Sequence, residues 1–220
     1  MTLLSVLIIL PVVPLWAIGV GIIVILTAII FFCSIPINGK KIAVLGPQGS
    51  GKTTFLSFLR NKQASGEATG LEHYKPFDYK LQNGQTVRIE GGIDIGGGDE
   101  YRSHYENLIK NNEAIIFIFD IHKYLTGYNK TKDKYVQLTD ARFKLVYDHF
   151  KANHPGEIDP HKLVVIGSHK DKLKQGDNKI KGAFYNLIRK KEYTEMFKNF
   201  RICDLTNKNE LKKIVDSIIA

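Results

Sequence analysis

The most specific chemical pattern in this 220-residue sequence is Gly46-Pro-Gln-Gly-Ser-Gly-Lys-Thr53, which fits G-x-x-x-x-G-K-[ST]. Glycines in such a segment let the chain curl so that successive N–H groups face phosphate oxygens, and a following helix adds its positive N-terminal end. The Lys52 ammonium can reach β- and γ-phosphates, and the Thr53 hydroxyl can ligate Mg²⁺. A simple Gly-rich turn would not explain a lysine at a helix N-terminus, where its charge is unfavourable. The segment therefore predicts a phosphate-binding loop.

Three further polar segments follow along the chain. Thr69 lies in a polar loop, Asp94-Ile-Gly-Gly97 ends a strand-like run, and Ser168-His-Lys-Asp171 follows an apolar run. Each also has a plainer structural interpretation. Asp94 could be a turn residue, Thr69 an ordinary loop threonine and Asp171 a helix cap.

The elements that must position these residues alternate between short strands and amphipathic helices, which is typical of an α/β fold with a mostly parallel sheet. Asn83-Gly84 predicts a two-residue hairpin turn between two of the strands. In chain order the sequence predicts strand 41–45, helix 53–61, strands 74–82, 85–95, 114–119 and 163–166, a weaker strand 200–205 and helix 209–220.

The N-terminal part of the sequence has no charged side chain from residue 2 to 37. Residues 15–35 would form about 31 Å of helix, enough to cross a hydrocarbon core. Lys40 and Lys41 follow directly, so the positive-inside rule predicts a single-pass anchor with the remaining domain in the cytoplasm. Pro11 and Pro14 leave a kinked or re-entrant hairpin as the alternative.

The net charge is +9, and ten basic against four acidic residues between Lys170 and Arg201 supply most of it. Such a face could attract anionic lipid, an acidic partner or nucleic acid, or it could be a solvated lysine-rich surface. Nucleic acid is not expected, because the aromatics Phe184, Tyr185, Tyr193 and Phe197 fit helical core spacing better than a stacking platform. Two cysteines exclude a disulfide framework and a four-cysteine zinc site.

The order and spacing of the motifs resemble those of a small Ras-like GTPase, closest to the Arf branch, from about Lys41 to Ala220. The layout of an anchor followed by such a domain is similar to that of the signal-recognition-particle receptor β-subunit family. The resemblance implies a P-loop NTPase three-layer fold with a mostly parallel six-stranded sheet. It places a membrane anchor at 1–37 and a GTP-binding domain at 38–220.

The resemblance also implies the ligands of the bound molecules. Thr53, Thr69 and Asp94 would hold Mg²⁺, and Asp171 would accept two hydrogen bonds from the guanine base. The nucleotide-binding residues would be Gly46, Gln48, Gly49, Ser50, Gly51, Lys52, Thr53, Thr54, Gly97, Ser168, His169, Asp171, Asp204 and Leu205.

The sequence departs from the family pattern in three places. Gly98 stands where these GTPases carry the glutamine that orients the attacking water, so hydrolysis should be slow unless a partner, Asp99 or His104 supplies the missing group. Ser168-His169 replaces Asn-Lys, which weakens the case for guanine specificity. Cys203–Asn207 replaces the usual Ser-Ala-Lys loop. The lysine- and tyrosine-rich stretch 121–134 is interpreted as a solvated insertion or a partner-binding loop.

The leading hypothesis is a membrane-anchored GTPase that binds GTP or GDP with Mg²⁺ and acts as a nucleotide-dependent switch, contacting a protein partner through its switch regions. No catalytic residue is identified. One alternative is a catalytically weak GTP-binding receptor or scaffold subunit. The other is an ATP-using P-loop NTPase.

Overall fold

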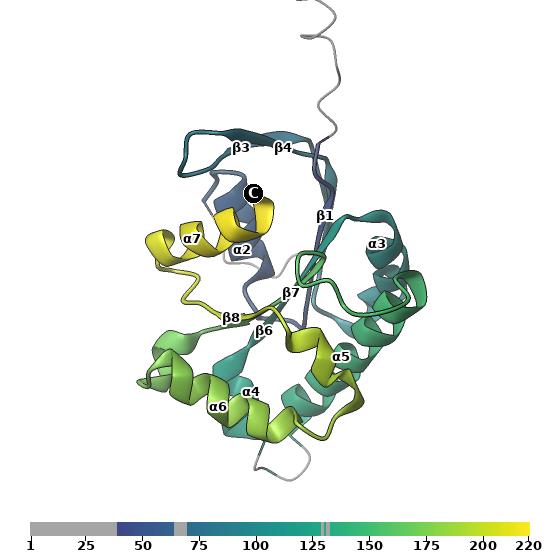
Figure 1. Ribbon diagram of the computed structural model, residues 1–220, viewed down its shortest axis with the longest axis vertical. Coiled ribbons are helices and arrows are strands. Elements are labelled where there is room, and N and C mark those ends of the chain that lie inside the picture. Colours follow the sequence, from purple (N-terminus) through teal and green to yellow (C-terminus); the bar gives the residue numbers. More distant parts are fainter. Residues whose placement is uncertain (1–38, 64–69, 129, 131–132) are drawn as a thin grey trace, which may run out of the picture. The chain divides into compact units, whose positions relative to one another are not determined.

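The computed structural model describes residues 39–63, 70–128, 130 and 133–220 (Figure 1). The predicted anchor at 1–37 and the predicted Mg²⁺ ligand Thr69 lie outside these residues. Gly39–Ala220 forms one compact unit. Within the described part of the chain, no helix combines the length and the apolar character that crossing a membrane requires.

A four-stranded parallel sheet is the centre of the fold, as the alternation of strands and helices predicted. Its apolar strands are buried on both faces, which is typical of parallel sheets covered by helices. Val44 pairs with Ile116, which in turn pairs with Val164, so the three longest strands are in register. In spatial order the strands are β1 (Ile42–Leu45), β6 (Ala114–Asp120), β7 (Leu163–Ser168) and β8 (Phe200–Ile202).

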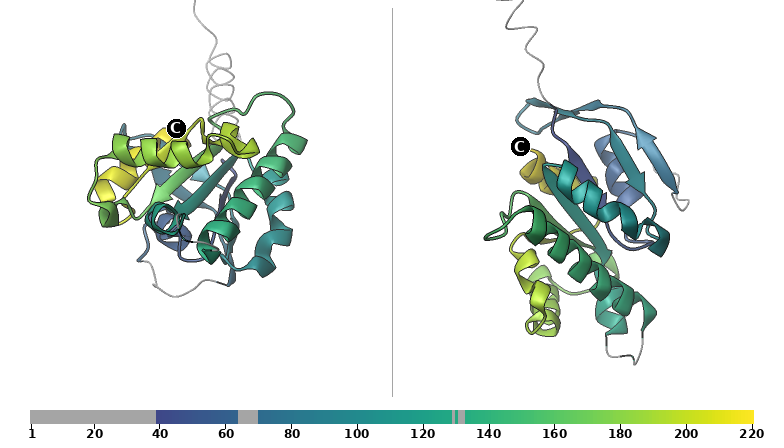
Figure 2. Two further views of the ribbon diagram at one scale, coloured as in Figure 1. Left: turned by 90° about the horizontal axis from the view of Figure 1, so that it is seen from below. Right: turned by 90° about the vertical axis from the view of Figure 1, so that its right-hand side faces the viewer.

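Helices cover both faces of this sheet (Figures 1 and 2). Side chains alternate along each strand, so Phe117 and Phe119 join one apolar cluster while Ile116 and Ile118 join the other. The second cluster contains α2 (Lys52–Leu59) and α7 (Lys208–Ile219). The first contains α3 (Tyr105–Asn111), α4 (Ile121–Gly127), α5 (Lys134–Asn153), α6 (Asp177–Ile188) and the 3₁₀ helix η3 (Glu192–Phe197). Two further 3₁₀ helices are η1 (Asp99–His104) and η2 (Lys170–Leu173).

The prediction of six strands in one sheet is wrong for the segment between α2 and α3. The first predicted strand, 74–82, is reduced to Phe77–Lys80, and an unpredicted strand, Leu71–Tyr74, precedes it. The second, 85–95, is divided into Thr86–Ile89 and Gly92–Ile95, and the four strands form two antiparallel pairs. Pro76 interrupts one strand because it has no N–H to donate, and at Gly91 a Cβ would lie 2.8 Å from the Tyr74 carbonyl oxygen. A bridge between Lys40, just before β1, and Ile89 connects the second of these pairs to the start of the sheet. The pairs are β2 (Leu71–Tyr74) with β5 (Gly92–Ile95) and β3 (Phe77–Lys80) with β4 (Thr86–Ile89).

The hairpin turn between β3 and β4 also differs from the prediction. The Leu81 N–H bonds the Gln85 carbonyl at 2.8 Å, and the Gly84 N–H bonds the Leu81 carbonyl at 3.1 Å. Gly84 has a φ of 87° whereas Asn83 has no positive φ, so the loop spans three residues and ends on a left-handed glycine. Asn83 contributes through its side chain, which accepts the Gln85 N–H at 3.0 Å.

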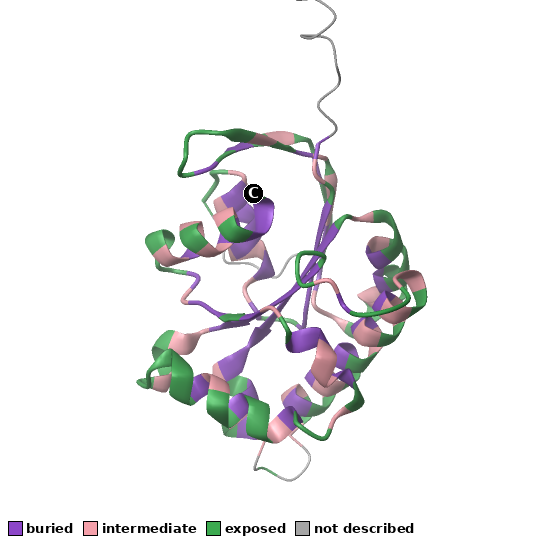
Figure 3. Cartoon of the chain, in the orientation of Figure 1, coloured by how far each residue is buried: buried purple, intermediate pink, exposed green. Residues whose placement is uncertain are grey.

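Other sequence expectations correspond more closely to the structure. Phe184, Tyr193 and Phe197 are buried in the core, as their helical spacing predicted, while Tyr185 is exposed. Figure 3 shows the central strands buried and the outer sides of the helices exposed. The stretch interpreted as an insertion begins instead with α4, because the Asp120 carboxylate accepts the Lys123 N–H at 2.9 Å and caps the helix.

Candidate functional site

The loop between β1 and α2 has a backbone that only its glycines permit. Gly46, Gly49 and Gly51 have φ values of 144°, 70° and 94°. A Cβ on Gly46 would lie 1.9 Å from the Ile118 carbonyl oxygen, and a Cβ on Gly51 would lie 2.4 Å from a methyl carbon of Leu205. The predicted phosphate loop therefore runs against the carboxyl ends of the central strands, where open α/β sheets bind ligands.

Lys52 opens α2 and is buried inside this loop. Its ammonium donates to the carbonyl oxygens of Gly46 and Pro47, both at 3.1 Å. Among the described residues no ion pair joins it to a carboxylate. Burial lowers the pKa of Lys52 to about 8, the charge of Asp94 opposes this, and the charge of Arg142 adds to it. The ammonium is therefore poorly compensated, and an anion in the loop would stabilise it.

Asp94 and Gly97 bring the second predicted motif onto the phosphate loop. Asp94 is fully buried in β5, and no hydrogen bond of ordinary geometry reaches its carboxylate from the described residues. Burial raises its pKa, while the charges of Lys52 and Arg60 and the side chain of Thr53 act to lower it. At Gly97 a Cβ would lie 2.2 Å from the backbone nitrogen of Gln48, so these two backbones are in direct contact.

Ser168 and His169 connect the end of β7 to the same loop. The Ser168 hydroxyl lies 2.8 Å from the Ser50 carbonyl oxygen and 3.0 Å from that of Phe119. His169 adopts a left-handed conformation with φ 59°, and its Nδ1 lies 2.8 Å from the Ser168 hydroxyl. Burial lowers the pKa of His169, against the charge of Asp120. The buried Ser168 thus links two strand ends to the phosphate loop.

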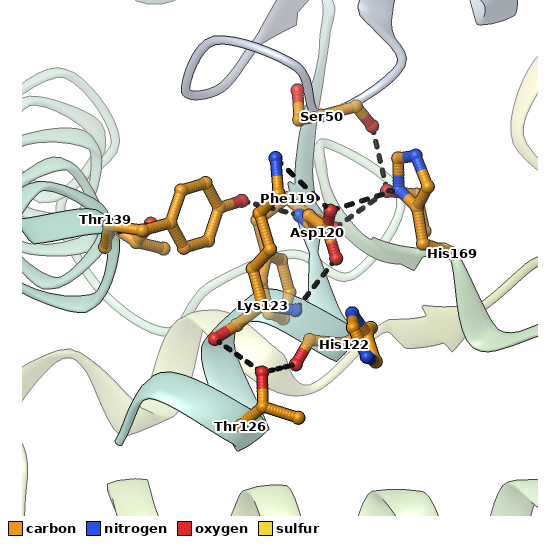
Figure 4. Close-up of polar contacts among 10 residues, drawn as sticks. Ser50, Phe119, Asp120, His122, Lys123, Thr126, Thr139 and His169 are labelled. Carbon is orange, nitrogen blue, oxygen red and sulfur yellow. Dashed lines mark hydrogen bonds and ion pairs between the residues drawn. The ribbon is translucent and has the colours of Figure 1, made fainter. Parts of the chain in front are cut away.

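Asp120 and Lys123 are site residues that the sequence analysis missed. Figure 4 shows Asp120 between Lys123 and His169, with Ser50 close by. One carboxylate oxygen of Asp120 lies 3.8 Å from the Lys123 ammonium and 3.6 Å from His169 Nδ1. That ammonium lies 3.6 Å from the position of a Cβ on Gly49, and half of its side chain is exposed. The sequence did contain a signal for Asp120, because it is an acid directly after the apolar run 114–119. The carboxyl ends of parallel strands lie at one edge of the sheet, where open α/β sheets bind ligands.

The remaining predicted residues differ in how far they are buried and in whether they contact the loop. Leu205 packs on Gly51, but the Asp204 carboxylate accepts the Thr206 N–H at 2.8 Å and so stabilises its own turn. Asp171 is exposed in η2 and makes no hydrogen bond to the described residues. Gln48 lies exposed on the rim of the loop, and Thr53 and Thr54 are half-buried in the first turn of α2.

Arg142 of α5 and Tyr105 of α3 complete the surroundings of the loop, and no motif in the sequence indicated either. Both are buried, and both contact Gly46: the Arg142 guanidinium donates to its carbonyl at 3.2 Å, and the Tyr105 hydroxyl accepts its N–H at 3.2 Å. These contacts brace the first residue of the loop from the side opposite α2.

Within the described residues, no three His, Cys, Asp or Glu side chains gather closely enough to hold a metal ion on their own. The buried Asp94 carboxylate instead lies beside the Thr53 side chain and Lys52. A metal ion held by Asp94 and Thr53 would need further oxygen ligands from a bound molecule or water.

No protein-family model matches the sequence, and no curated protein is significantly similar to it.

Proposed function

We propose that this chain is a guanine-nucleotide-binding protein of the small GTPase type, which binds GTP or GDP with Mg²⁺. The observation that carries the proposal is the phosphate loop. Three glycines with positive φ curl the chain in front of α2. Lys52 is buried inside, and the hydrogen-bond acceptors that its ammonium reaches among the described residues are the carbonyl oxygens of Gly46 and Pro47. A phosphate group supplies the negative charge that this buried ammonium lacks.

Mg²⁺ fits the residues beside the loop. The buried Asp94 carboxylate and the Thr53 side chain are hard oxygen ligands, and phosphate oxygens and waters would complete the set that this ion prefers. Thr69 joins the proposed ligands on sequence grounds alone. When bound, Mg²⁺ neutralises charge on the β- and γ-phosphates.

Asp171 is the residue that we assign to base recognition. It lies just beyond β7, and its carboxylate is exposed and makes no hydrogen bond to the described residues, so both oxygens can accept from a ligand. Guanine offers two neighbouring N–H donors on its edge, whereas adenine does not, so this carboxylate would discriminate between the two bases. Lys123, whose ammonium lies 3.6 Å from the position of a Cβ on Gly49, adds a positive charge beside the phosphate loop.

Hydrolysis is expected to be slow without a partner. Gly98 has no side chain with which to orient water, and the neighbouring Asp99 is paired with Arg142. Gly97 contacts the phosphate loop through its backbone, so a γ-phosphate there could order the segment that follows. The same observations favour a second candidate, a receptor or scaffold subunit that holds GTP without turning it over.

We place the protein at a membrane, anchored through residues 1–37, with the nucleotide-binding domain in the cytoplasm. The support is the uncharged N-terminal sequence followed by Lys40 and Lys41. In this position the domain would meet its protein partner through the segments after Thr69 and Gly97.

Calorimetric titration of the full chain in detergent micelles tests the proposal, with GDP, GTP, ADP and ATP each added in the presence of Mg²⁺. We expect guanine nucleotides to bind at least tenfold more tightly than adenine nucleotides. Lys52→Ala should abolish binding, and Asp171→Asn should shift preference toward xanthosine nucleotides. Phosphate release then separates the switch from the scaffold. Equal binding of all four nucleotides, or none, would refute the proposal, and adenine preference would favour an ATP-using protein.

A further inference from the structure

Arg142 is a buried charge, and within the described ranges its one ion-pair partner is a half-exposed aspartate. The Arg142 side chain is 2% exposed, and one guanidinium nitrogen lies 3.1 Å from a carboxylate oxygen of Asp99, whose side chain is 53% exposed. A second nitrogen donates to the Gly46 carbonyl at 3.2 Å, and Nε has no hydrogen-bond partner among the described residues. Arg142 therefore joins the phosphate loop to the first residue of η1.

The Gly46 carbonyl has more donors than it can satisfy. Lys52 approaches it at 3.1 Å, Arg142 at 3.2 Å and the Tyr105 hydroxyl at 3.4 Å, while a carbonyl oxygen has two lone pairs. The two cations compete for one acceptor and repel each other, and the charge of Arg142 contributes to lowering the pKa of Lys52. Negative charge arriving at Lys52 therefore acts on Arg142 as well.

We propose that the Asp99–Arg142 ion pair sets the relative affinity of the site for nucleoside diphosphates and triphosphates. This inference rests on the proposed nucleotide-binding function. A third phosphate adds negative charge beside Lys52, attracts Arg142 and repels Asp99, so it weakens the pair. Because linkage is reciprocal, an intact pair must in turn disfavour the triphosphate. Arg142 acts here as a positioning residue that holds η1 against the phosphate loop until the γ-phosphate arrives.

The decisive variant is Asp99→Asn in the full chain, because it removes one charge at a half-exposed position and preserves the shape of the side chain. Equilibrium titration with GDP and with the slowly hydrolysed analogue GTPγS gives the ratio of the two affinities. We expect the preference for GTPγS over GDP to rise at least fivefold, the lower end of ordinary coupling between sites. Glu100→Gln is the matched control, because Glu100 is an exposed acid on the same 3₁₀ helix without an ion pair in the described part of the chain, and it should leave the ratio within twofold.

A double-mutant cycle separates the ion pair from simple charge removal. In an Arg142→Met background, which removes the charge that pairs with Asp99, Asp99→Asn should change the ratio less than twofold. An unchanged ratio in Asp99→Asn alone, or an equal change in Glu100→Gln, would overturn the inference while nucleotide binding stands. Absence of nucleotide binding by the unaltered protein would overturn the proposed function and the inference together.

Discussion

At the residue scale, Lys52 carries its charge where water cannot solvate it. Its pKa of about 8 lies below the ordinary 10.5, so between these values the unfolded chain binds a proton that the folded chain does not. The free energy of unfolding must then rise with pH across this window. The full penalty for the charged side chain, roughly 3 kcal/mol from the size of the shift, is present below pH 8.

Lys52→Met removes this pH dependence. We expect the nucleotide-free variant to be more stable than the unaltered protein at pH 7, by up to roughly 3 kcal/mol, and the difference to shrink as the pH rises from 8 to 10.5. Urea denaturation of both proteins at a series of pH values measures it. A difference that stays constant across this range would show that Lys52 is solvated in the empty loop.

Gly98 and Gly97 differ in their capacity for a side chain. Gly98 has φ −70°, which any residue adopts, and the atoms nearest to a Cβ there belong to the flexible carboxylate of Glu100, 2.2 Å away. Gly98→Gln should therefore fold and raise the rate of phosphate release from GTP at least tenfold, since the amide can orient water. A Gly98→Gln variant as slow as the unaltered protein would favour the scaffold function.

Gly97→Ala, by contrast, would clash with the Gln48 backbone and should lower nucleotide affinity.

A substitution at Lys123 tests whether this residue, which the sequence analysis missed, contributes to nucleotide binding. Its ammonium lies beside Gly49 and 5.6 Å above the Tyr135 ring, so it is held near the loop while half exposed. Lys123→Met should weaken GDP binding about tenfold, whereas Lys123→Arg should retain most of it. Lys179, an exposed lysine of α6, provides the control Lys179→Met, which should have no effect. Equal affinities for both methionine variants would remove Lys123 from the site.

At the scale of elements, the β3–β4 hairpin is attached to α7 by a polar network. The Asp216 carboxylate accepts the Tyr79 hydroxyl at 2.9 Å, the Gln82 N–H at 2.8 Å and the Lys212 ammonium at 2.8 Å. Although burial acts to raise the pKa of Asp216, these hydrogen bonds lower it overall, so its stabilising effect is lost as the pH falls through the carboxyl range.

Asp216→Asn breaks this attachment in part. We expect the free energy of unfolding at pH 7 to fall by about 1–3 kcal/mol, because an amide accepts fewer and weaker hydrogen bonds than a carboxylate. The stability of the variant should also depend less on pH between 2 and 5. Urea denaturation at pH 7 and in acid tests both points, with Asp148→Asn on the exposed face of α5 as the control. A loss equal to that of the control would show that α7 and the hairpin are held by apolar packing alone.

At the scale of the whole molecule, the uncharged N-terminal segment and the basic surface offer two ways to reach a membrane. If 1–37 is an anchor, the full chain should remain with membranes after washing in high salt and leave only with detergent. Salt screens surface charge within about 10 Å at 0.1 M, so a chain held by its lysines alone would be released. Fractionation of the full chain and of a variant lacking 1–37 tests this. Release of the full chain by salt would contradict the anchor.

The glycine loop in front of α2 and the buried strands of the parallel sheet could be recognised from local sequence. Gly46, Gly49 and Gly51 have positive φ values, which glycine adopts most readily, and short continuous apolar runs are typical of buried parallel strands. Both are properties of a few consecutive residues. For the same reason the sequence pattern failed between α2 and α3: it missed the strand Leu71–Tyr74, and it joined β4 and β5 into one strand across Gly91.

Tertiary structure alone decided which side chains surround that loop. Arg142 lies 96 positions after Gly46, and Ser168 lies 118 positions after Ser50, yet each is in hydrogen-bond contact with the loop. No spacing along the chain encodes these contacts, because they arise when β1, β6 and β7 align and their carboxyl ends meet at one edge. Local sequence thus accounts for the glycine loop in front of α2, whereas the packing of the sheet and α5 placed the charged side chains around it.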